Sequence, residues 1–341
     1  MARFRVKYFG SNDVPVDLIK PILDEIDAEL VIARPVSDAE IVEAGRDADA
    51  IIMHGSVPFT KPIISQLKRT KVVCRTGVGV DRMDLAAAEE FGIKVCNAAG
   101  CNSIEVAEQT IGLLIAISRK LVRMNQYVRE GKWRRHTAEL HRYRGRVYRI
   151  AGRTLGIVGL GHVGRQVAPR AQGMGLNVQT YDPYLDSKIA EGMGVKMISF
   201  DELVRASDFI SLHAPLTNQT RKMFSVPQFK AMKNTAYLIN CARGGLVDSE
   251  ALYDALAAGQ IAGAALDVTD PEPLPADHKL LTLPNVIVTC HTAANSDESY
   301  IDCQTHAARE VARVLIGQPP TTEVKDPWLL AEAQDQGFGG V

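Results

Sequence analysis

The sequence predicts an α/β fold with two domains, each built on a doubly wound parallel sheet, and with the second domain inserted into the first. Three observations lead to this prediction. The 341 residues are too many for one ordinary core. Short β-branched runs alternate with helical patterns along most of the chain, which is typical of parallel sheets with right-handed crossovers. A helical segment lies on each side of the second alternating series, as expected of an inserted domain.

The first alternating series covers the first hundred residues. Its expected strands are Phe4–Phe9, Leu30–Ala33, Ala50–Met53, Val72–Cys74 and Lys94–Cys96. Its expected helices are Pro15–Asp27, which has a proline near its start, and residues 38–45, 60–68 and 84–91.

A long helix is expected from Ser103 to Arg129. Ser103 can cap it. One apolar stripe runs along it through Val106, Thr110, Leu113, Leu114, Ile117 and Leu121. Because this helix exceeds the usual globular length, we expect it to bridge the two domains.

The second series begins at Thr154 and contains seven strand candidates. They are TLGIVG, NVQTYD, KMIS, DFISLH, AYLINC, GAALDV and NVIVTCH, and one good helix follows near Asp297–Gly317. We therefore expect residues 1–102 and 295–341 to form one domain, and residues 103–294 to form the inserted domain.

Composition excludes several function classes. The formal net charge of −1 argues against a chain that coats nucleic acid or an anionic membrane. No apolar stretch approaches the ~20 residues that span a bilayer. The first ten residues carry no signal stretch, and the six cysteines form no CxxC pair, so free thiols and a cytoplasmic location are expected. No metal is expected, because the chain has no HExxH and His136 and His141 are wrongly spaced for a helical pair.

Residues 159–164 form a GxGxxG motif, Gly-Leu-Gly-His-Val-Gly. The motif follows an expected strand and opens an expected helix, which makes it far more specific than the glycine pattern alone. Gly159 permits a tight turn, Gly161 lets the backbone approach a pyrophosphate, and Gly164 lets the helix pack closely on the sheet. The helix N-terminus, with His162 and Val163, supplies backbone N–H groups to the phosphates.

Asp182 ends the next expected strand, 23 residues beyond Gly159. Its carboxylate can accept hydrogen bonds from ribose hydroxyls and would repel a 2′-phosphate. We therefore predict NAD, rather than NADP, as the cofactor.

Three later strands each lead to one polar residue. Arg243, Glu272 and His291 follow the strands that end near Asn240, Val268 and Thr289. The carboxyl ends of strands form the ligand crevice of open α/β sheets, so these side chains are expected to converge there. An arginine can hold a carboxylate, a histidine can exchange a proton at neutral pH, and a paired glutamate orients the ring and favours its protonated form. Such a set suits reduction of a 2-oxo acid by a nicotinamide cofactor.

With these motifs in order, the sequence resembles the D-isomer-specific 2-hydroxyacid dehydrogenases over nearly its whole length. The resemblance runs through Arg75–Asp81, Gly156–Val158 with the glycine motif, His213–Thr217, Asn240–Asp248, Asp267–Pro273 and His291. It implies a flavodoxin-like substrate domain, a Rossmann NAD-binding domain and an active cleft between the two.

The resemblance also implies residue roles. Arg243 binds the substrate carboxylate, Glu272 pairs with His291, and His291 is the acid/base. The loop at Val78 and Gly79 meets the substrate, and Asp267 contacts the nicotinamide amide. Further cofactor contacts are expected at Thr110, His213, Cys241, Ala242, Arg243, His291 and Ala293.

Several departures leave the substrate open. Cys290 and Ala99 stand where the family usually has proline. Glu105 and the segment Thr292–Ser296 are closer to the C-terminal-binding-protein branch than to the phosphoglycerate branch. The alternative is therefore a dinucleotide-sensing, corepressor-like scaffold of the same superfamily. Formate dehydrogenase is disfavoured because that branch resembles a Gln–His pair, where this chain has Glu272 and His291.

The segment from Arg129 to Arg153 carries nine basic residues. A solvated or dimer-facing connector is the simpler interpretation, and a patch that steers an anionic substrate is the sharper one. Nucleic-acid binding is disfavoured because the chain carries no DNA-reading motif and, beyond Trp133, Tyr143 and Tyr148, no interleaved aromatic platform. The family resemblance implies a homodimer that acts on a small 2-oxo or 2-hydroxy acid.

Overall fold

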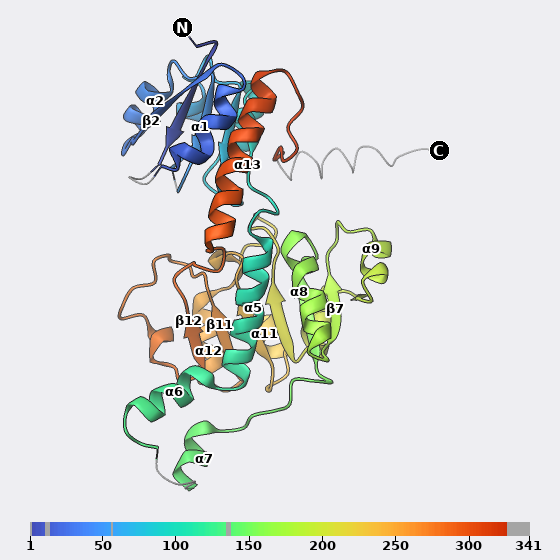
Figure 1. Cartoon of the computed structure of the whole chain (residues 1–341). Coiled ribbons are helices and arrows are strands. Elements are labelled where there is room, and N and C mark those ends of the chain that lie inside the picture. The colour runs from blue at the N-terminus through green and yellow to red at the C-terminus, as the bar shows by residue number, and fades with distance from the viewer. Residues whose placement is uncertain (1, 11–13, 56, 134–137, 326–341) are drawn as a thin grey trace. The chain divides into compact units, whose positions relative to one another are not determined.

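The computed structural model describes residues 2–10, 14–55, 57–133 and 138–325 (Figure 1). The chain divides into two compact units. One comprises Met1–Asn102 together with the segment from Ser296 onward, and the other comprises Ser103–Asn295. We refer to them as unit 1 and unit 2.

Unit 1 is built on a five-stranded parallel sheet. Its strands are β1 (Phe4–Phe9), β2 (Ala28–Ala33), β3 (Ala50–Met53), β4 (Val72–Arg75) and β5 (Lys94–Cys96). They lie in the order β2-β1-β3-β4-β5, which is the flavodoxin-like order, so the predicted fold class of this part is confirmed.

Helices cover both faces of this sheet. On one face, α1 (Val16–Asp24) packs beside α13 (Asp297–Leu315), and the buried side chains of both helices join one apolar core. On the other face lie α2 (Asp38–Gly45), α3 (Lys61–Ile64) and α4 (Leu85–Glu90), with a second core. The Ser296 hydroxyl caps α13 by accepting from the Ser299 N–H at 2.9 Å.

Unit 2 is built on seven parallel strands, and all seven strand candidates of the sequence are confirmed. They are β6 (Thr154–Val158), β7 (Asn177–Tyr181), β8 (Lys196–Met197), β9 (Phe209–Leu212), β10 (Tyr237–Asn240), β11 (Gly263–Leu266) and β12 (Val286–Val288). The order is β12-β11-β10-β9-β6-β7-β8. The strand order reverses between β6 and β9, so this point is the topological switch point, where ligands bind in such sheets.

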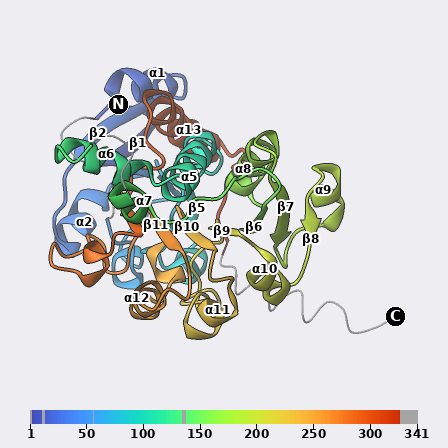
Figure 2. The same ribbon diagram turned by 90° about the horizontal axis from the view of Figure 1, so that it is seen from below.

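The sheet of unit 2 lies between two layers of helices (Figure 2). One layer contains α5 (Ser103–Ser118) and α8 (His162–Gly173). The other contains α10 (Phe200–Ala206), α11 (Val226–Ala231) and α12 (Ser249–Ala257). The short helix α9 (Ser187–Gly192) packs at the β8 edge.

The single long helix predicted from Ser103 to Arg129 is wrong, because the chain forms α5 and then a separate helix α6 (Leu121–Arg129). Lys120 adopts a left-handed backbone, with φ 60°, which ends the regular helix. The Lys120 ammonium lies 5.0 Å from the centre of the Tyr237 ring. The predicted apolar stripe is buried through Ile117, but Leu121 beyond the break is 52% exposed.

The connector after α6 is exposed where the structure describes it. Helix α7 (Ala138–Arg144) has no buried residue, and it contacts α6 through Tyr127 and Tyr143, whose ring centres are 4.7 Å apart. Part of the basic segment, residues 134–137, lies outside the described residues.

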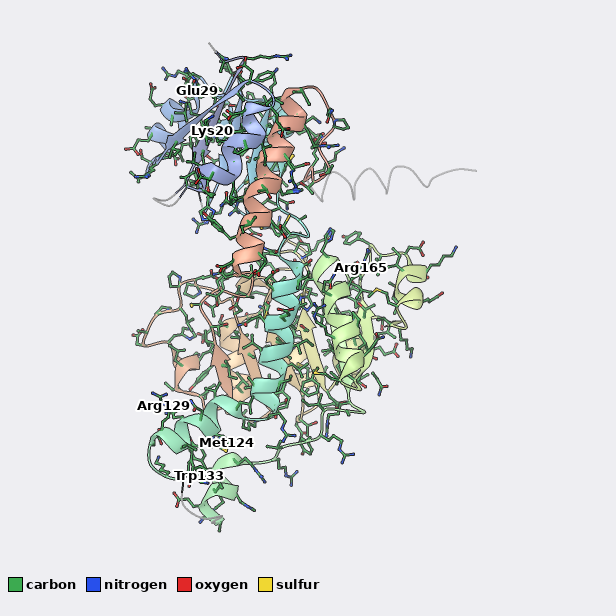
Figure 3. The ribbon with its side chains drawn as sticks, in the orientation of Figure 1. Lys20, Glu29, Met124, Arg129, Trp133 and Arg165 are labelled. Carbon is green, nitrogen blue, oxygen red and sulfur yellow. The ribbon has the colours of Figure 1, made fainter. Side chains whose placement is uncertain are left out.

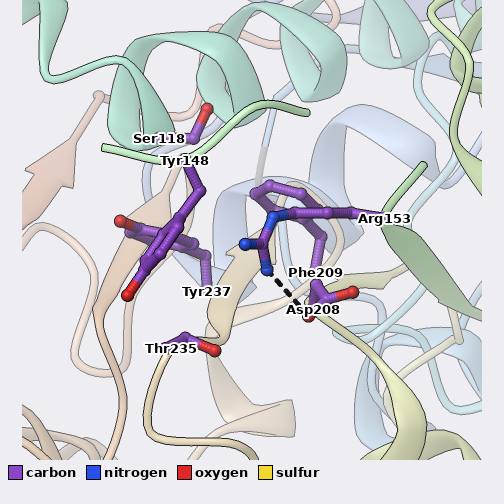
Figure 4. Close-up of a pocket in the computed structure, with 7 residues that line it drawn as sticks. All are labelled: Ser118, Tyr148, Arg153, Asp208, Phe209, Thr235 and Tyr237. Carbon is purple, nitrogen blue, oxygen red and sulfur yellow. Dashed lines mark hydrogen bonds and ion pairs between the residues drawn. The ribbon is translucent and has the colours of Figure 1, made fainter. Parts of the chain in front are cut away.

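At the amino ends of the unit 2 strands, the Asp208 carboxylate bonds to two other segments of the chain, and Figure 4 shows its contact with Arg153. Its carboxylate accepts from the Thr154 N–H at 3.0 Å, and from the Arg153 guanidinium and the Lys233 ammonium, each at 3.1 Å. The adjoining cavity of about 10 Å³ has room for no more than one water molecule, so it is not a substrate site.

We predict that Asp208→Ala lowers the free energy of unfolding by about 2–3 kcal/mol, because it leaves Arg153 and Lys233 without their carboxylate. Denaturation with urea measures the change. Asp201→Ala, which removes an exposed carboxylate of the same unit, is the control and should cost less than about 1 kcal/mol. Equal losses in the two variants would contradict the anchoring role of Asp208.

Candidate active site

The three predicted catalytic residues follow three neighbouring strands of unit 2. Strands β10, β11 and β12 are adjacent and parallel, with Asn240 beside Leu266 and Leu266 beside Val288. Arg243, Glu272 and His291 come shortly after these strand ends. Parallel strands lie ~4.8 Å apart, so the three loops start within ~10 Å of one another.

His291 and Glu272 form a hydrogen-bonded pair, as predicted. The distance between His291 Nδ1 and Glu272 Oε1 is 2.5 Å. The two side chains remain 48% and 42% exposed, so the other ring nitrogen can be reached by a small molecule. The carboxylate fixes the plane of the ring, and it holds a proton on Nδ1, which leaves Nε2 for exchange.

The turn that presents His291 is held by Asp267, which is 1% exposed. The Asp267 carboxylate accepts from the Thr289 hydroxyl at 2.5 Å, from the Thr292 N–H at 3.1 Å and from the Ala293 N–H at 2.9 Å. The Asp267 carbonyl accepts from the His291 N–H at 2.8 Å. His291 itself has φ 56°, a left-handed conformation that is uncommon for residues other than glycine and that these bonds maintain.

The loop that carries Arg243 is held in a similar way by Asn240, which is fully buried. The Asn240 side chain donates to the Arg243 carbonyl at 2.9 Å and accepts from the Ala242 N–H at 3.0 Å. Gly244 then packs directly on the backbone of Thr269, because a Cβ built on Gly244 would lie 1.9 Å from the Thr269 oxygen. The arginine loop and the loop that leads to Glu272 are therefore in backbone contact.

The glycine motif has the geometry that a dinucleotide cradle requires. Gly159 has φ 92°, and a Cβ there would lie 3.0 Å from the Ala214 nitrogen. A Cβ on Gly164 would lie 2.4 Å from the Gly159 oxygen. Gly161 has open space around its Cβ position, and it precedes the first turn of α8, whose N-terminus carries no side-chain cap. The residues present therefore fit a pyrophosphate at this helix end.

Asp182 and His213 flank this cradle. The Asp182 carboxylate accepts from the Leu160 N–H at 2.9 Å and from the Tyr184 N–H at 3.1 Å, so it also shapes the glycine turn. His213 follows β9, and its main chain lies against Gly159. Burial lowers the pKa of His213 to about 4, so the ring is neutral at pH 7, and it pairs with the Ser211 hydroxyl at 2.8 Å.

Other predicted cofactor contacts are mostly buried. The Thr110 hydroxyl is fully buried and donates to the Val106 carbonyl at 2.7 Å. Thr110 also hydrogen-bonds to the Cys241 thiol, whose pKa burial raises to about 12. His162 is exposed, whereas Ala293 is buried. That these residues contact a cofactor stays a prediction.

The predicted substrate loop at Val78 and Gly79 belongs to unit 1. The Asn97 side-chain amide donates to the Val78 carbonyl at 2.7 Å. The Arg75 guanidinium donates to the Gly79 carbonyl and, at 2.7 Å, to the Gly55 carbonyl. Arg75 thus ties together the loops that follow β3 and β4, and the backbone of this loop is well held.

Sequence reasoning missed the positioning roles of Asn240 and Asp267, and the close approach at Gly244. One available signal is that Asn240 and Asp267 are polar residues directly at the ends of otherwise apolar strands. The conformation at His291 left no such signal.

Within the described parts of the chain, no group of three or more His, Cys, Asp or Glu side chains is placed to hold a metal ion. Of the helices among those same residues, none has both the length and the apolar character needed to cross a membrane.

Comparison with known proteins agrees with this geometry. Residues 111–293 match the model of the D-isomer specific 2-hydroxyacid dehydrogenase NAD binding domain. A D-3-phosphoglycerate dehydrogenase of Methanocaldococcus jannaschii is 40% identical over 323 residues, 94% of this chain and 60% of that protein. A glyoxylate reductase of Korarchaeum cryptofilum is 36% identical over 311 residues, 91% of this chain and 92% of that protein.

A solved structure, the TT0316 protein of Thermus thermophilus, has a TM-score of 0.82 and 34% identity, and the match covers 94% of this chain and 99% of that one. The chain spans between 47% and 60% of the length of the D-3-phosphoglycerate dehydrogenases to which it is similar. The family model confirms NAD as the cofactor.

We predict that NADPH binds at least tenfold more weakly than NADH, because a 2′-phosphate would meet the Asp182 carboxylate. Asp182→Ala should bring the two affinities closer together, even though loss of the Asp182 contact to the Leu160 N–H weakens the binding of both cofactors. Titration calorimetry with each cofactor measures the ratio. Equal affinities in the unaltered protein would refute the role assigned to Asp182.

Proposed function

Because the chain belongs to the D-isomer specific 2-hydroxyacid dehydrogenases, we propose that it interconverts a 2-oxo acid and a D-2-hydroxy acid. The observation that carries the proposal is the hydrogen-bonded pair of His291 and Glu272, with 2.5 Å between Nδ1 and Oε1. Glu272 follows β11 and His291 follows β12, and β11 lies beside β10, the strand that the Arg243 loop follows. The glycine cradle for the dinucleotide lies in the same sheet, after β6.

In this proposal each residue has a distinct task. Bound NADH supplies the hydride that reduces the substrate carbonyl carbon. The Arg243 guanidinium holds the substrate carboxylate. Protonated His291 donates a proton from Nε2 to the carbonyl oxygen, and the Glu272 carboxylate holds the ring in place through Nδ1. Oxidation of the hydroxy acid runs the same proton path in reverse.

The relatives carry names of three activities: D-3-phosphoglycerate dehydrogenase, glyoxylate reductase and hydroxypyruvate reductase. We propose that the substrate is a short 2-oxo acid of the kind these enzyme names imply, with or without a phosphate group. The corepressor-like alternative has no support from these names. Oxidation of NADH by the purified protein in the presence of glyoxylate, hydroxypyruvate, phosphohydroxypyruvate or pyruvate tests the proposal. Turnover with none of the four would favour the scaffold.

We predict that His291→Ala lowers kcat by about 10²–10⁴-fold, because the proton donor is lost. The dissociation constant for NADH should change less than about twofold, because the glycine cradle is untouched. Steady-state kinetics and titration calorimetry measure the two quantities.

His141→Ala removes an exposed histidine of α7 and is the matched control, with unchanged kcat. Glu272→Gln keeps the shape of the pair but removes its charge, so its kcat should lie between those of His291→Ala and the unaltered protein. Near-full turnover by His291→Ala, with chemistry as the slow step, would show that another group donates the proton.

We propose that the protein is a homodimer and that α6 contributes to its interface. Exposed apolar side chains gather on α6 and directly after it, among them Leu121 and Val122, with Trp133 69% exposed. Figure 3 labels Met124, Arg129 and Trp133 in this region. Such side chains on a surface favour burial against another chain. The six free cysteines support a reducing compartment, and we propose the cytoplasm.

We predict a dimeric mass by light scattering at micromolar concentration. Leu121→Asp with Val122→Asp should shift the protein to monomer, because two carboxylates would be buried in the interface. Ile189→Asp, on exposed α9, is the control and should leave the mass unchanged. A monomeric mass for the unaltered protein would contradict the proposal.

A further inference from the structure

Two cysteines and a histidine from distant parts of the sequence form a cluster in unit 1. Cys101 lies in the turn after β5 and is partly exposed, whereas Cys303 is buried on α13. His306 lies three residues after Cys303, so the two side chains share one face of the helix. The Cys303 thiol and the His306 ring both hydrogen-bond to the Cys101 sulfur.

His306 is held in place by the segment that follows α13. Its Nε2 lies 2.9 Å from the Thr322 hydroxyl. Thr322 donates in turn to the Asn97 carbonyl at 2.7 Å, so the hydroxyl is left to accept a hydrogen bond from the ring. Glu310, one turn further along α13, is anchored by the Thr321 and Thr322 N–H groups at 2.7 and 3.0 Å.

These contacts stabilise a thiolate at Cys101. The hydrogen bond from the Cys303 thiol, together with the His306 hydrogen bond and charge, lowers the pKa of Cys101 to about 5, against the opposing effects of burial and of Asp302. The hydrogen bond to Cys101 and the nearby Glu310 carboxylate raise the pKa of His306. At pH 7 the cluster therefore holds a thiolate at Cys101 beside a histidine whose pKa this thiolate raises.

The buried thiols of Cys74, Cys96 and Cys241 lack such stabilisation of a thiolate. Burial raises the pKa of Cys74, and it raises the pKa values of Cys96 and Cys241 to about 12. A buried thiol with a raised pKa is a poor nucleophile. Unlike Cys74, Cys96 and Cys241, Cys101 is only partly buried, and its contacts stabilise the thiolate.

We propose that Cys101 is a peroxide-reactive thiolate and that Cys303 resolves its oxidised form into a disulfide. The proposal stands on the placement of Cys101, Cys303 and His306, and it does not depend on the dehydrogenase activity. Reversible thiol oxidation of this kind is compatible with a reducing compartment.

The chemistry balances with a peroxide as oxidant. The Cys101 thiolate attacks one peroxide oxygen, the O–O bond breaks, and the leaving oxygen takes a proton from His306 or water. Cys101 is now a sulfenic acid, and the peroxide has accepted two electrons. The Cys303 sulfur then attacks the Cys101 sulfur, and the S–O bond breaks. Water leaves with the thiol proton, and a disulfide remains.

The disulfide would have a defined place in the chain. Unit 1 continues into unit 2 at Asn102–Ser103, and the chain returns at Asn295–Ser296. A link from Cys101 to Cys303 encloses residues 102–302, and hence the whole of unit 2, in a covalent ring. It would tie together the two segments of unit 1 that flank these crossings.

The reactivity of Cys101 is tested by alkylation with iodoacetamide from pH 4 to 9, followed by peptide mass spectrometry. The rate at Cys101 should rise up to about pH 6 and then change less than about twofold to pH 8, because the thiolate is already formed. N-acetylcysteine in the same tube, with an ordinary thiol pKa, should react about 80-fold faster at pH 8 than at pH 6.

His306→Gln should move the pH at which the Cys101 alkylation rate rises to a higher value, because the His306 interactions that lower the Cys101 pKa are removed. Arg309→Gln removes an exposed positive charge from the same helix, and it should leave that pH unchanged. A Cys101 profile in the unaltered protein that follows N-acetylcysteine would overturn the proposal, as would equal shifts in the two variants.

The resolving step is tested with one equivalent of hydrogen peroxide and non-reducing peptide mapping. The unaltered protein should yield a Cys101–Cys303 linked peptide that dithiothreitol releases. Cys303→Ser should instead accumulate a sulfenic acid at Cys101, which dimedone traps. Dimedone adducts at Cys101 of the unaltered protein, without the linked peptide, would refute the role of Cys303.

Discussion

The geometry of the candidate site in unit 2 depends on one buried carboxylate, that of Asp267. Removing a carboxylate from water costs several kcal/mol unless hydrogen bonds replace the lost hydration. Here the Thr289 hydroxyl and the N–H groups of Thr292 and Ala293 supply those bonds. All three donors lie in the turn around His291, so the carboxylate receives its hydrogen bonds only when this turn is folded. The left-handed conformation at His291 is a consequence, because the donors on both sides of it must reach one acceptor group.

The carboxyl ends of the unit 2 strands show a second constraint, which is that the backbones of neighbouring loops approach each other closely. The arginine loop meets the Thr269 backbone at Gly244, and the glycine turn meets the β9 end at Gly159. A side chain at either position would push two loops apart. Catalytic groups must be held within ~0.5 Å of their working geometry. The glycines therefore contribute to precision at positions where they touch no reactant.

Much of this architecture could be predicted from the sequence, because parallel sheets buried on both faces need apolar runs of strand length. All twelve strands lie at positions that the sequence predicted, and most of them follow from such runs. The pairing of Glu272 with His291 followed from the family resemblance, and only weakly from spacing. The break at Lys120 could not be predicted, since nothing local disfavours a helix there. The break depends on a tertiary contact, in which the Lys120 ammonium packs on the ring of Tyr237, the first residue of β10. The contacts of the Asp267 carboxylate likewise require knowing that β11 lies beside β12.

The loops of unit 1 show why the substrate side chain is harder to predict than the reaction. At the carboxyl ends of β1 and β3, a chain of polar contacts joins Tyr8 to Gln304, and His54 to both Gln304 and Thr76. Burial, and then the Arg75 charge, lower the pKa of His54, so this ring is mainly neutral at pH 7. Arg75 is committed to the carbonyls of Gly55 and Gly79. His54 and Arg75, whose residue types suggest substrate binding, are thus engaged in contacts that hold the loops. The shape and polarity that remain are set by packing among segments far apart in the sequence. By contrast, the residues to which we assign the proton transfer and the carboxylate binding lie in short motifs at strand ends.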